Sequence, residues 1–295
     1  MAEATIPVDL FNPGQVFACL GLVEAAEMLL GEAAAAFDWS EPTQVRFHLQ
    51  AAGSEDPIRH VLGFVSEARA VALAPHGSSN VAGWAASWGA CEELPSGAPY
   101  PFDDPDSPAT LVAALRGPTG ALLLDHWGDT TRDNVKFWAG AAGYPGAALA
   151  RDALELVRKL LPESAADPFA FARPQSSSFR LDWRRDYIPI DAGFSLNLHG
   201  SEFSAVGYPL VELLAAIGLG AARPARRTKL DYRYGVVGRA AAGQHGLWLP
   251  PAFLRAALGT TPLGFPRRTF RMHLGWPGKE GQARSITTVI EETDA

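Results

Sequence analysis

The segment of residues 207–239 constrains the fold more strongly than any other stretch of the sequence, because a strongly apolar run is followed at once by a basic one. The apolar residues recur at the spacing of a buried helix. They are Leu210, Val211, Leu213, Leu214 and Ile217. Gly218 and Gly220 end that run, and Pro224 prevents its continuation. The sequence therefore predicts a buried helix that holds the following basic residues at a fixed place on the surface.

The basic residues that follow are dense and lie close to aromatic ones. Six of them occupy positions 223 to 239: Arg223, Arg226, Arg227, Lys229, Arg233 and Arg239. Tyr232 and Tyr234 lie among them, and aromatic rings beside guanidinium groups suit base stacking combined with phosphate pairing. A second group follows further along the chain: Arg267, Arg268, Arg271 and Lys279. We predict that these residues form a nucleic-acid-binding surface.

Other interpretations of the same residues stay open. On an alternating strand Arg267 and Arg271 face one way and Arg268 the other, so one partner would meet only two of the three. A basic run is also often a solvated loop, or its members pair with acidic residues nearer the N-terminus across an internal interface. A further alternative is a structural adaptor, whose basic segment contacts an acidic neighbouring protein and no nucleic acid.

Charge divides the chain into an acidic and a basic region, although the net formal charge is −7. Residues 1–170 hold 9 Lys and Arg against 22 Asp and Glu, whereas residues 223–284 hold 12 against 2. Such asymmetry favours a polyanionic partner for the basic region. The Pro-, Ala- and Ser-rich segment 162–178 suits a boundary. We therefore expect an acidic α+β lobe over residues 1–165 that packs on other proteins, and a basic, strand-rich α+β lobe over residues 170–295 that binds nucleic acid.

Hydrophobic periodicity predicts both helices and strands, irregularly mixed. Helices are expected over residues 16–30, 147–161 and 253–258, and a helix or a helix followed by a strand over residues 58–73. Strands are expected over residues 45–49, 121–124, 179–183, 194–198, 229–237, 269–274 and 285–290. Because no regular alternation of strand and helix appears, the fold class is α+β with mixed, largely antiparallel sheets.

Catalytic and cofactor motifs are largely absent. The sequence contains no dinucleotide-binding or phosphate-binding glycine motif, no nucleophile elbow and no zinc-protease helix motif. We therefore expect no enzyme activity, no cofactor, no metal and no small-molecule substrate. The alternative is a metal-dependent nuclease or other hydrolase with its site at Asp125, His126 and Asp129.

The cysteines and the first residues predict a cytoplasmic protein. Cys19 and Cys91 belong to no metal-binding motif, and both are expected to be buried thiols in a reducing compartment. The first fifteen residues lack a basic region followed by an apolar one, so no signal peptide is predicted. No apolar run approaches the length of about 20 residues that spans a bilayer.

Several phrases resemble the CRISPR-associated proteins of type I-U (also called I-G) systems. They are FNPGQVFACLGLVEAAEMLL, LLLDHW followed by VKFWAG, DYIPIDAGFSLNLHG and YPLVELLAAIGLGAARP, and they run in order from Phe11 to about Tyr234. The resemblance implies a non-catalytic subunit of a Cascade-type, RNA-guided antiviral effector complex. Such a subunit would bind crRNA, target DNA or both, together with the other effector subunits.

The resemblance also bears on the fold. Related effector subunits of the RAMP superfamily have a ferredoxin-like, RNA-binding core and a glycine-rich loop near the C-terminus, so a RAMP-like core with insertions is implied. Here the only comparable loop is Gly275 to Gly281, which departs from the glycine-rich pattern. That departure leaves open whether the chain is a backbone, a large-subunit-like or an accessory subunit.

Overall fold

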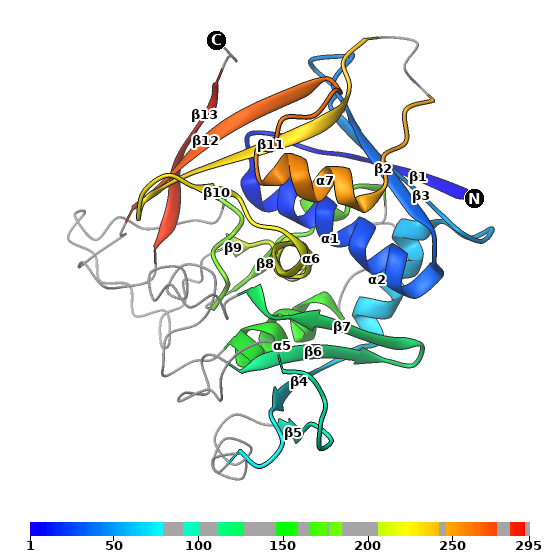
Figure 1. The fold of residues 1–295 in the computed structure, drawn as a ribbon, viewed down its shortest axis with the longest axis vertical. Coiled ribbons are helices and arrows are strands. Elements are labelled where there is room, and N and C mark those ends of the chain that lie inside the picture. The colour runs from blue at the N-terminus through cyan, green and yellow to red at the C-terminus, as the bar shows by residue number, and fades with distance from the viewer. Residues whose placement is uncertain are drawn as a thin grey trace.

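The fold is α+β, with mixed, mostly antiparallel sheets and, in the described regions of the chain, five α-helices. A computed structural model describes residues 1–78, 91–100, 111–126, 146–158, 166–175, 177–184, 206–241, 246–275 and 284–292. The predicted fold class is thus confirmed. Figure 1 shows a large sheet at one end of the molecule, a smaller sheet at the other, and helices between them.

The large sheet joins the first strands of the chain to the last. Its order is β1 (Ala2–Pro7), β3 (Arg46–Ala51), β2 (Ala33–Asp38), β11 (Asp231–Arg239), β12 (Arg267–Gly275) and β13 (Ser285–Glu292), and β10 (Ala225–Arg226) also pairs with β11. All of these pairs are antiparallel except β2 with β11, where Phe37 and Asp38 lie opposite Gly238 and Arg239. The single parallel junction is where the two halves of the sequence meet.

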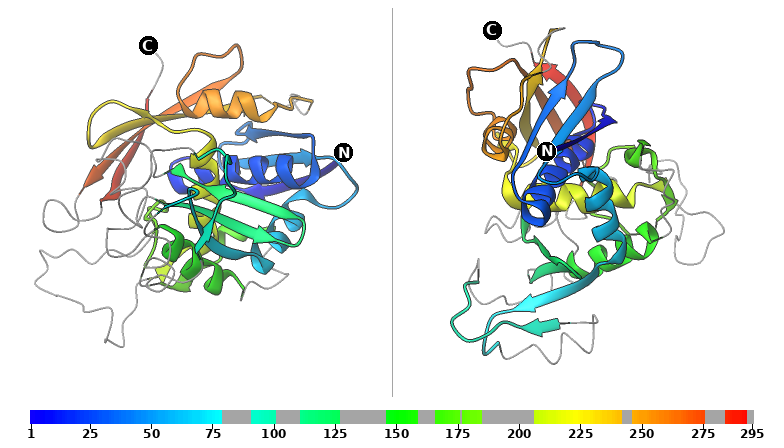
Figure 2. Two further views of the ribbon diagram at one scale, coloured as in Figure 1. Left: turned by 60° about the horizontal axis from the view of Figure 1, so that its bottom comes forward. Right: turned by 90° about the vertical axis from the view of Figure 1, so that its right-hand side faces the viewer.

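The smaller sheet has the order β5 (Cys91–Glu93), β4 (Arg69–Ala74), β6 (Val112–Gly117) and β7 (Gly120–Leu124). Its pairs are antiparallel except β4 with β5. A separate two-stranded ladder joins β8 (Arg173–Pro174) to β9 (Val206–Gly207). Four helices fill the space between the two sheets (Figures 1 and 2): α1 (Pro13–Leu30), α2 (Pro57–Glu67), α5 (Gly146–Val157) and α6 (Pro209–Ala221). The fifth, α7 (Pro251–Leu258), packs against β11.

Local sequence signals fix where the first two helices begin. The side chain of Asn12 accepts a hydrogen bond from the backbone nitrogen of Gly14, and Pro13 occupies the first turn of α1. Asp56 caps α2 in the same way, ahead of Pro57. Gly31 follows the end of α1 with φ of 88°, a conformation that glycine adopts without strain.

A glycine that was expected to end a helix, Gly218, instead lies where two helices cross. The helix α6 continues through Gly218 and Gly220 to Ala221, so the predicted stop was wrong. A Cβ atom at Gly218 would lie 2.2 Å from the carbonyl oxygen of Phe17, and one at Gly21 would lie 1.9 Å from the carbonyl oxygen of Leu214. The absence of side chains at Gly21 and Gly218 therefore lets α1 and α6 cross with their backbones in contact.

One hydrophobic core runs through the described residues of both halves. A single cluster of buried side chains extends from Ile6 to Val289 and includes most of α1, α6 and the inner face of β11. Because β2 and β11 also share a sheet, the expected division into lobes over 1–165 and 170–295 does not correspond to separate cores. The change from acidic to basic residues along this sequence therefore does not coincide with a boundary between two hydrophobic cores.

The helix α1 corrects the expectation that no apolar run is long enough to cross a membrane. Its 18 residues pass that test of length and composition, but 78% of them are buried inside the fold. It is therefore a core helix, and no membrane span is indicated among the described residues.

Most predicted elements are confirmed with shifted ends, but the strand expected over residues 179–183 is absent. Arg180 has a φ of 64°, which is incompatible with an extended strand. The next two backbone nitrogens, of Leu181 and Asp182, donate to the carboxylate of Glu212 on α6 rather than to a neighbouring strand. The strand expected over residues 194–198 lies outside the described residues.

Candidate nucleic-acid interface

The turn between β10 and β11 displays exposed cationic side chains. The backbone nitrogens of Arg227 and Thr228 both donate to the carbonyl oxygen of Asp231, which closes a tight turn. Arg226, Arg227 and Lys229 lie on this turn and are exposed, as predicted from the sequence. The turn therefore presents three positive charges at the edge of the large sheet.

The outer face of the same strands continues this positive surface. Arg233 on β11 lies directly opposite Arg271 on β12 in the antiparallel register. Glu292 on β13 forms ion pairs with both Arg227 and Arg233. A single carboxylate therefore holds two guanidinium groups side by side, and it competes with any outside anion for both.

A second carboxylate, that of Asp231, acts in the same way further along the face. It accepts two hydrogen bonds of 3.1 Å from the guanidinium of Arg271, and its Oδ1 lies 3.4 Å from Nδ1 of His273. The hydrogen bonds from Arg271 lower the pKa of the Asp231 carboxyl. We call Arg226, Arg227, Lys229, Arg233 and Arg271 the basic face. Two carboxylates, Asp231 and Glu292, lie among its five cations and pair with Arg227, Arg233 and Arg271.

Arg268 belongs to the opposite side of β12. Its guanidinium donates two hydrogen bonds of 2.6 Å to Glu291 and lies over the ring of Phe270, 5.3 Å from its centroid. These bonds lower the pKa of Glu291. Arg267 is half-buried at the start of β12, where it donates to the carbonyl oxygen of Thr261. The predicted alternation is thus observed: Arg271 is on the basic face and Arg268 is not.

The two tyrosines predicted to stack on bases are in the core, so that prediction is wrong. Tyr232 and Tyr234 are 1% and 0% exposed. The hydroxyl of Tyr234 donates to the carbonyl oxygen of Leu10, and its ring stacks on Phe270. The alternation of β11 decides this outcome, because a strand with one face against α1 must turn its large rings inward and its arginines outward.

Arg239 is also not available to a phosphate, contrary to prediction. Its side chain is buried at 3% exposure, and it donates twice to the carbonyl oxygen of Leu247. The guanidinium also lies over the ring of Trp248 and 4.0 Å from Asp38. Arg239 occupies the junction of β2 and β11, where it joins the two halves of the sheet.

Two further predicted residues have different outcomes. Arg223 is half-buried between α6 and β10, and its positive charge acts on Asp125. Lys279 lies outside the described residues.

The acidic partners of the basic residues come mainly from their own region of the chain. The alternative interpretation expected acids of residues 1–165 to pair with these arginines. In the described residues Glu24 pairs with Arg255 and Asp38 with Arg239 across that divide, so the alternative holds for Arg239. Arg227, Arg233 and Arg271 of the basic face pair instead with Asp231 and Glu292. The ion pairs of Arg227, Arg233 and Arg271 are therefore formed within the basic region itself.

The residues of the alternative hydrolytic site are mostly enclosed. His126 is 1% exposed and packs edge-on against Phe179. Asp125 is half-buried, and burial raises the pKa of its carboxyl while Arg223 opposes that shift. Asp129 lies outside the described residues, and within those described no group of three or more His, Cys, Asp or Glu side chains is arranged to hold a metal ion.

Sequence reasoning missed a cavity of about 500 Å³ beside the start of α1. Its lining comes from five separate stretches of the chain and includes Gln15 and Arg184. Gln15 carried no local signal, and Arg184 was not among the predicted site residues. The one sequence feature that points to this place is Asn12-Pro13-Gly14, which marks the start of a helix. The first turn of a helix has backbone N–H groups without partners in the helix, so hydrogen-bond donors gather there.

Comparison with known proteins adds no relative: no protein-family model, no curated protein and no solved structure matches this chain.

Proposed function

We propose that this chain is a non-catalytic, nucleic-acid-binding subunit of a type I CRISPR effector complex in the cytoplasm. It contacts the phosphate backbone of crRNA, target DNA or both through the basic face, and packs on sister subunits elsewhere. The single observation that carries the nucleic-acid binding is the gathering of five cations, three exposed and two half-buried, on one continuous surface, the β10–β11 turn and the outer side of β11 and β12. The assignment to a CRISPR complex rests on the sequence resemblance.

The binding mode that these contacts favour is electrostatic. With Tyr232 and Tyr234 in the core, the basic face offers guanidinium and ammonium groups and no stacking rings from β11. Phosphate contacts fix the position of a strand and carry no base identity. In such a complex, sequence recognition belongs to pairing between guide and target.

The order of the first elements supports a RAMP-like core within this proposal. The chain begins β1, α1, β2, β3, α2, and β3 lies between β1 and β2 in the sheet. This is the split βαβ arrangement with which a ferredoxin-like domain begins. The next strand, β4, joins the smaller sheet instead of completing the ferredoxin-like one, so the core would be an incomplete or diverged form.

The test is the salt dependence of binding to single-stranded RNA and DNA, followed by fluorescence anisotropy. Each phosphate neutralised on a single strand contributes about 0.7 to the slope of log affinity against log salt. Replacing Arg226, Arg227 and Lys229 by Ala should flatten that slope by about two units and weaken binding equally for unrelated sequences. The matched control replaces Arg59, Arg69 and Arg151, three exposed arginines of other surfaces, by Ala and so removes the same charge.

A second variant gives the opposite sign. Glu292→Gln removes the carboxylate that holds Arg227 and Arg233, so both guanidinium groups become available and binding should tighten. Equal losses in the basic-face variant and its control would refute this surface. Binding of an acidic protein without any nucleic acid would identify the structural adaptor, and metal-dependent cleavage abolished by His126→Ala would identify the hydrolase.

A further inference from the structure

The cavity at the start of α1 has the size of a small-molecule site. Its volume is about 500 Å³, within the range of about 300–1,000 Å³ that ligand pockets occupy. The charged and amide residues that line it are Asp9, Gln15, Gln44, Arg46, Asp167 and Arg184. Thr43 and Val45, on either side of Gln44, are also part of the wall. These residues are distinct from the basic face, so the cavity is a separate site.

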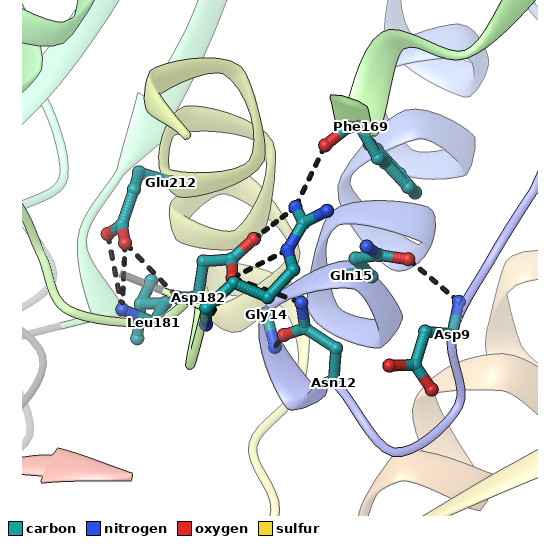
Figure 3. A network of polar contacts seen from close by, with 9 residues as sticks. Asp9, Asn12, Gly14, Gln15, Phe169, Leu181, Asp182 and Glu212 are labelled. Carbon is teal, nitrogen blue, oxygen red and sulfur yellow. Dashed lines mark hydrogen bonds and ion pairs between the residues drawn. The ribbon is translucent and has the colours of Figure 1, made fainter. Parts of the chain in front are cut away.

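Arg184 is held rigidly at this cavity by hydrogen bonds to Asp182 and Phe169. Figure 3 shows these two acceptors and the network that continues from Asp182 to Asn12. The guanidinium of Arg184 donates from Nε and Nη2 to the carboxylate of Asp182, at 3.1 and 2.6 Å, and from Nη2 to the carbonyl oxygen of Phe169. The side chain of Asp182 is fully buried and accepts a further bond from Asn12. The guanidinium also lies over the ring of Tyr208, 3.6 Å from its centroid. Its position is therefore fixed before any ligand arrives.

The third nitrogen of that guanidinium is left for an outside acceptor. Nη1 of Arg184 makes no hydrogen bond to any residue that the structure describes, whereas Nε and Nη2 are both engaged. The side chain is 29% exposed, so this nitrogen has access to the cavity that Arg184 lines. A preorganised donor of this kind favours binding because little conformational entropy remains to be lost.

Gln15 supplies a second donor that is fixed in the same way. The residue is 5% exposed, and its Oε1 accepts a hydrogen bond of 2.7 Å from the backbone nitrogen of Asp9. Because that position must be an acceptor, the bond identifies the oxygen of the carboxamide, and Nε2 lies on the other side of the group (Figure 3). Among the described residues Nε2 has no acceptor, and it is not one of the fully buried polar atoms, so it remains accessible from the cavity that Gln15 lines. A ligand oxygen in the cavity would satisfy it.

The charges around the cavity limit what the ligand can be. Arg46 and Arg184 contribute two positive charges, but Asp9 and Asp167 line the same cavity and Asp182 neutralises Arg184 from behind. A group with two or more negative charges would be repelled by these carboxylates. A group with one negative charge, carried on a body with N–H or O–H donors for Asp9 and Asp167, matches the lining.

We propose that this cavity binds a small organic ligand through a singly charged oxyanion. The oxyanion accepts hydrogen bonds from Nη1 of Arg184 and Nε2 of Gln15, with Arg46 adding positive charge from the start of β3. The donor groups of the ligand face Asp9 and Asp167. A carboxylate of an amino acid and a phosphodiester of a dinucleotide both have this chemistry, so the test distinguishes these two sources.

The experiment titrates the full chain with glycine, with the dinucleotide UpU and with uridine monophosphate, by calorimetry and ligand-observed NMR. Saturable binding of glycine or of UpU is expected, and the one that binds identifies the source. Uridine monophosphate, whose phosphate carries close to two charges, should bind more weakly than UpU. Arg46→Gln removes an exposed positive charge and should weaken binding at least tenfold, whereas Arg59→Gln, the same change on α2, should leave it unaltered.

Gln15→Glu tests the donor itself. The new carboxylate keeps the acceptor for the Asp9 nitrogen and presents its second oxygen to Arg184, so it takes the place of the ligand and should abolish binding. Absence of saturable binding by both glycine and UpU would overturn the proposal. Equal affinity in the wild type and the Arg46→Gln variant would also overturn it, even if Gln15→Glu failed to fold. Removing Arg226, Arg227 and Lys229 should leave this binding intact, which separates it from the proposed function.

Discussion

Replacing Gly218 by Ala should destabilise the protein, although alanine is the better helix former. The added Cβ would lie 2.2 Å from the carbonyl oxygen of Phe17 and 2.7 Å from the backbone nitrogen of Gly21. Both are backbone atoms of α1, so no side chain can rotate away, and the two helices must separate by about 1 Å to restore van der Waals contact. The packing of α1 on α6 is the most extensive contact between elements in the fold, so this separation affects the whole core.

The magnitude follows from two opposing contributions. Overpacking a well-packed core costs about 1–3 kcal/mol and occasionally more, and an immovable backbone contact places Gly218→Ala near the upper end. The higher helix propensity of Ala relative to Gly stabilises the folded state by about 1 kcal/mol and so offsets part of that cost. The free energy of unfolding should therefore fall by about 2 kcal/mol, measured by urea denaturation followed by circular dichroism.

Gly63 provides the matched control. It lies on the exposed side of α2, and a Cβ there would meet nothing within 4 Å. Gly63→Ala should therefore raise the free energy of unfolding by up to about 1 kcal/mol. If Gly218→Ala proved as stable as the wild type while Gly63→Ala behaved as expected, the close crossing of α1 and α6 would be refuted.

Three further predictions concern a carboxylate, a buried hydroxyl and the two thiols. Because Arg268 lowers the pKa of Glu291, the pair stabilises the fold above the unfolded pKa of about 4.3, and this contribution is lost as pH falls through the lower folded pKa. Urea denaturation below pH 4 should thus show a flatter pH dependence for Glu291→Gln. Tyr234→Phe removes the bond to a buried carbonyl and should cost about 1 kcal/mol of stability, with nucleic-acid affinity unchanged in anisotropy titrations. Burial raises the pKa of Cys19 well above its usual range, so mass spectrometry after native alkylation should find label on the half-buried Cys91 and none on Cys19 until the protein unfolds.

The elements that sequence predicted well are those whose signals are local. The helix after Asn12-Pro13 and the strand over 285–292 both follow from caps or from period-two alternation. The C-terminal end of α6 could not be predicted in this way. A glycine near the end of an apolar run, such as Gly218, looks the same in the sequence whether it ends the helix or lets a second helix pack closely against it. Only the presence of Gly21 across the interface distinguishes the two cases, and that neighbour is about 200 positions away.

The candidate interface was predictable in its location but not in its chemistry. A cluster of arginines on exposed strands follows from composition, and Arg226, Arg227 and Lys229 lie where expected. Whether Tyr232 faces solvent depends on which side of β11 is covered, and alternation fixes only that it faces away from Arg233. The cavity beside α1 was not predictable beyond the helix start that Asn12-Pro13-Gly14 marks, because Gln15 and Arg184 meet only after the chain between them has folded.

The long separation between α1 and its partner helix has a consequence during synthesis. The last residue of α1 is Leu30 and the last of α6 is Ala221, so 191 residues must be added after α1 before its main contact surface exists. At about 5–20 residues per second this takes roughly 10–40 s. Throughout that interval the face of α1 that packs on α6 has no partner, although α2, β2 and β3 can already contact the helix, and an uncovered apolar face is the kind of surface that chaperones at the ribosome bind. The yield of folded protein in a cell should therefore depend on chaperone supply more than its final stability would suggest.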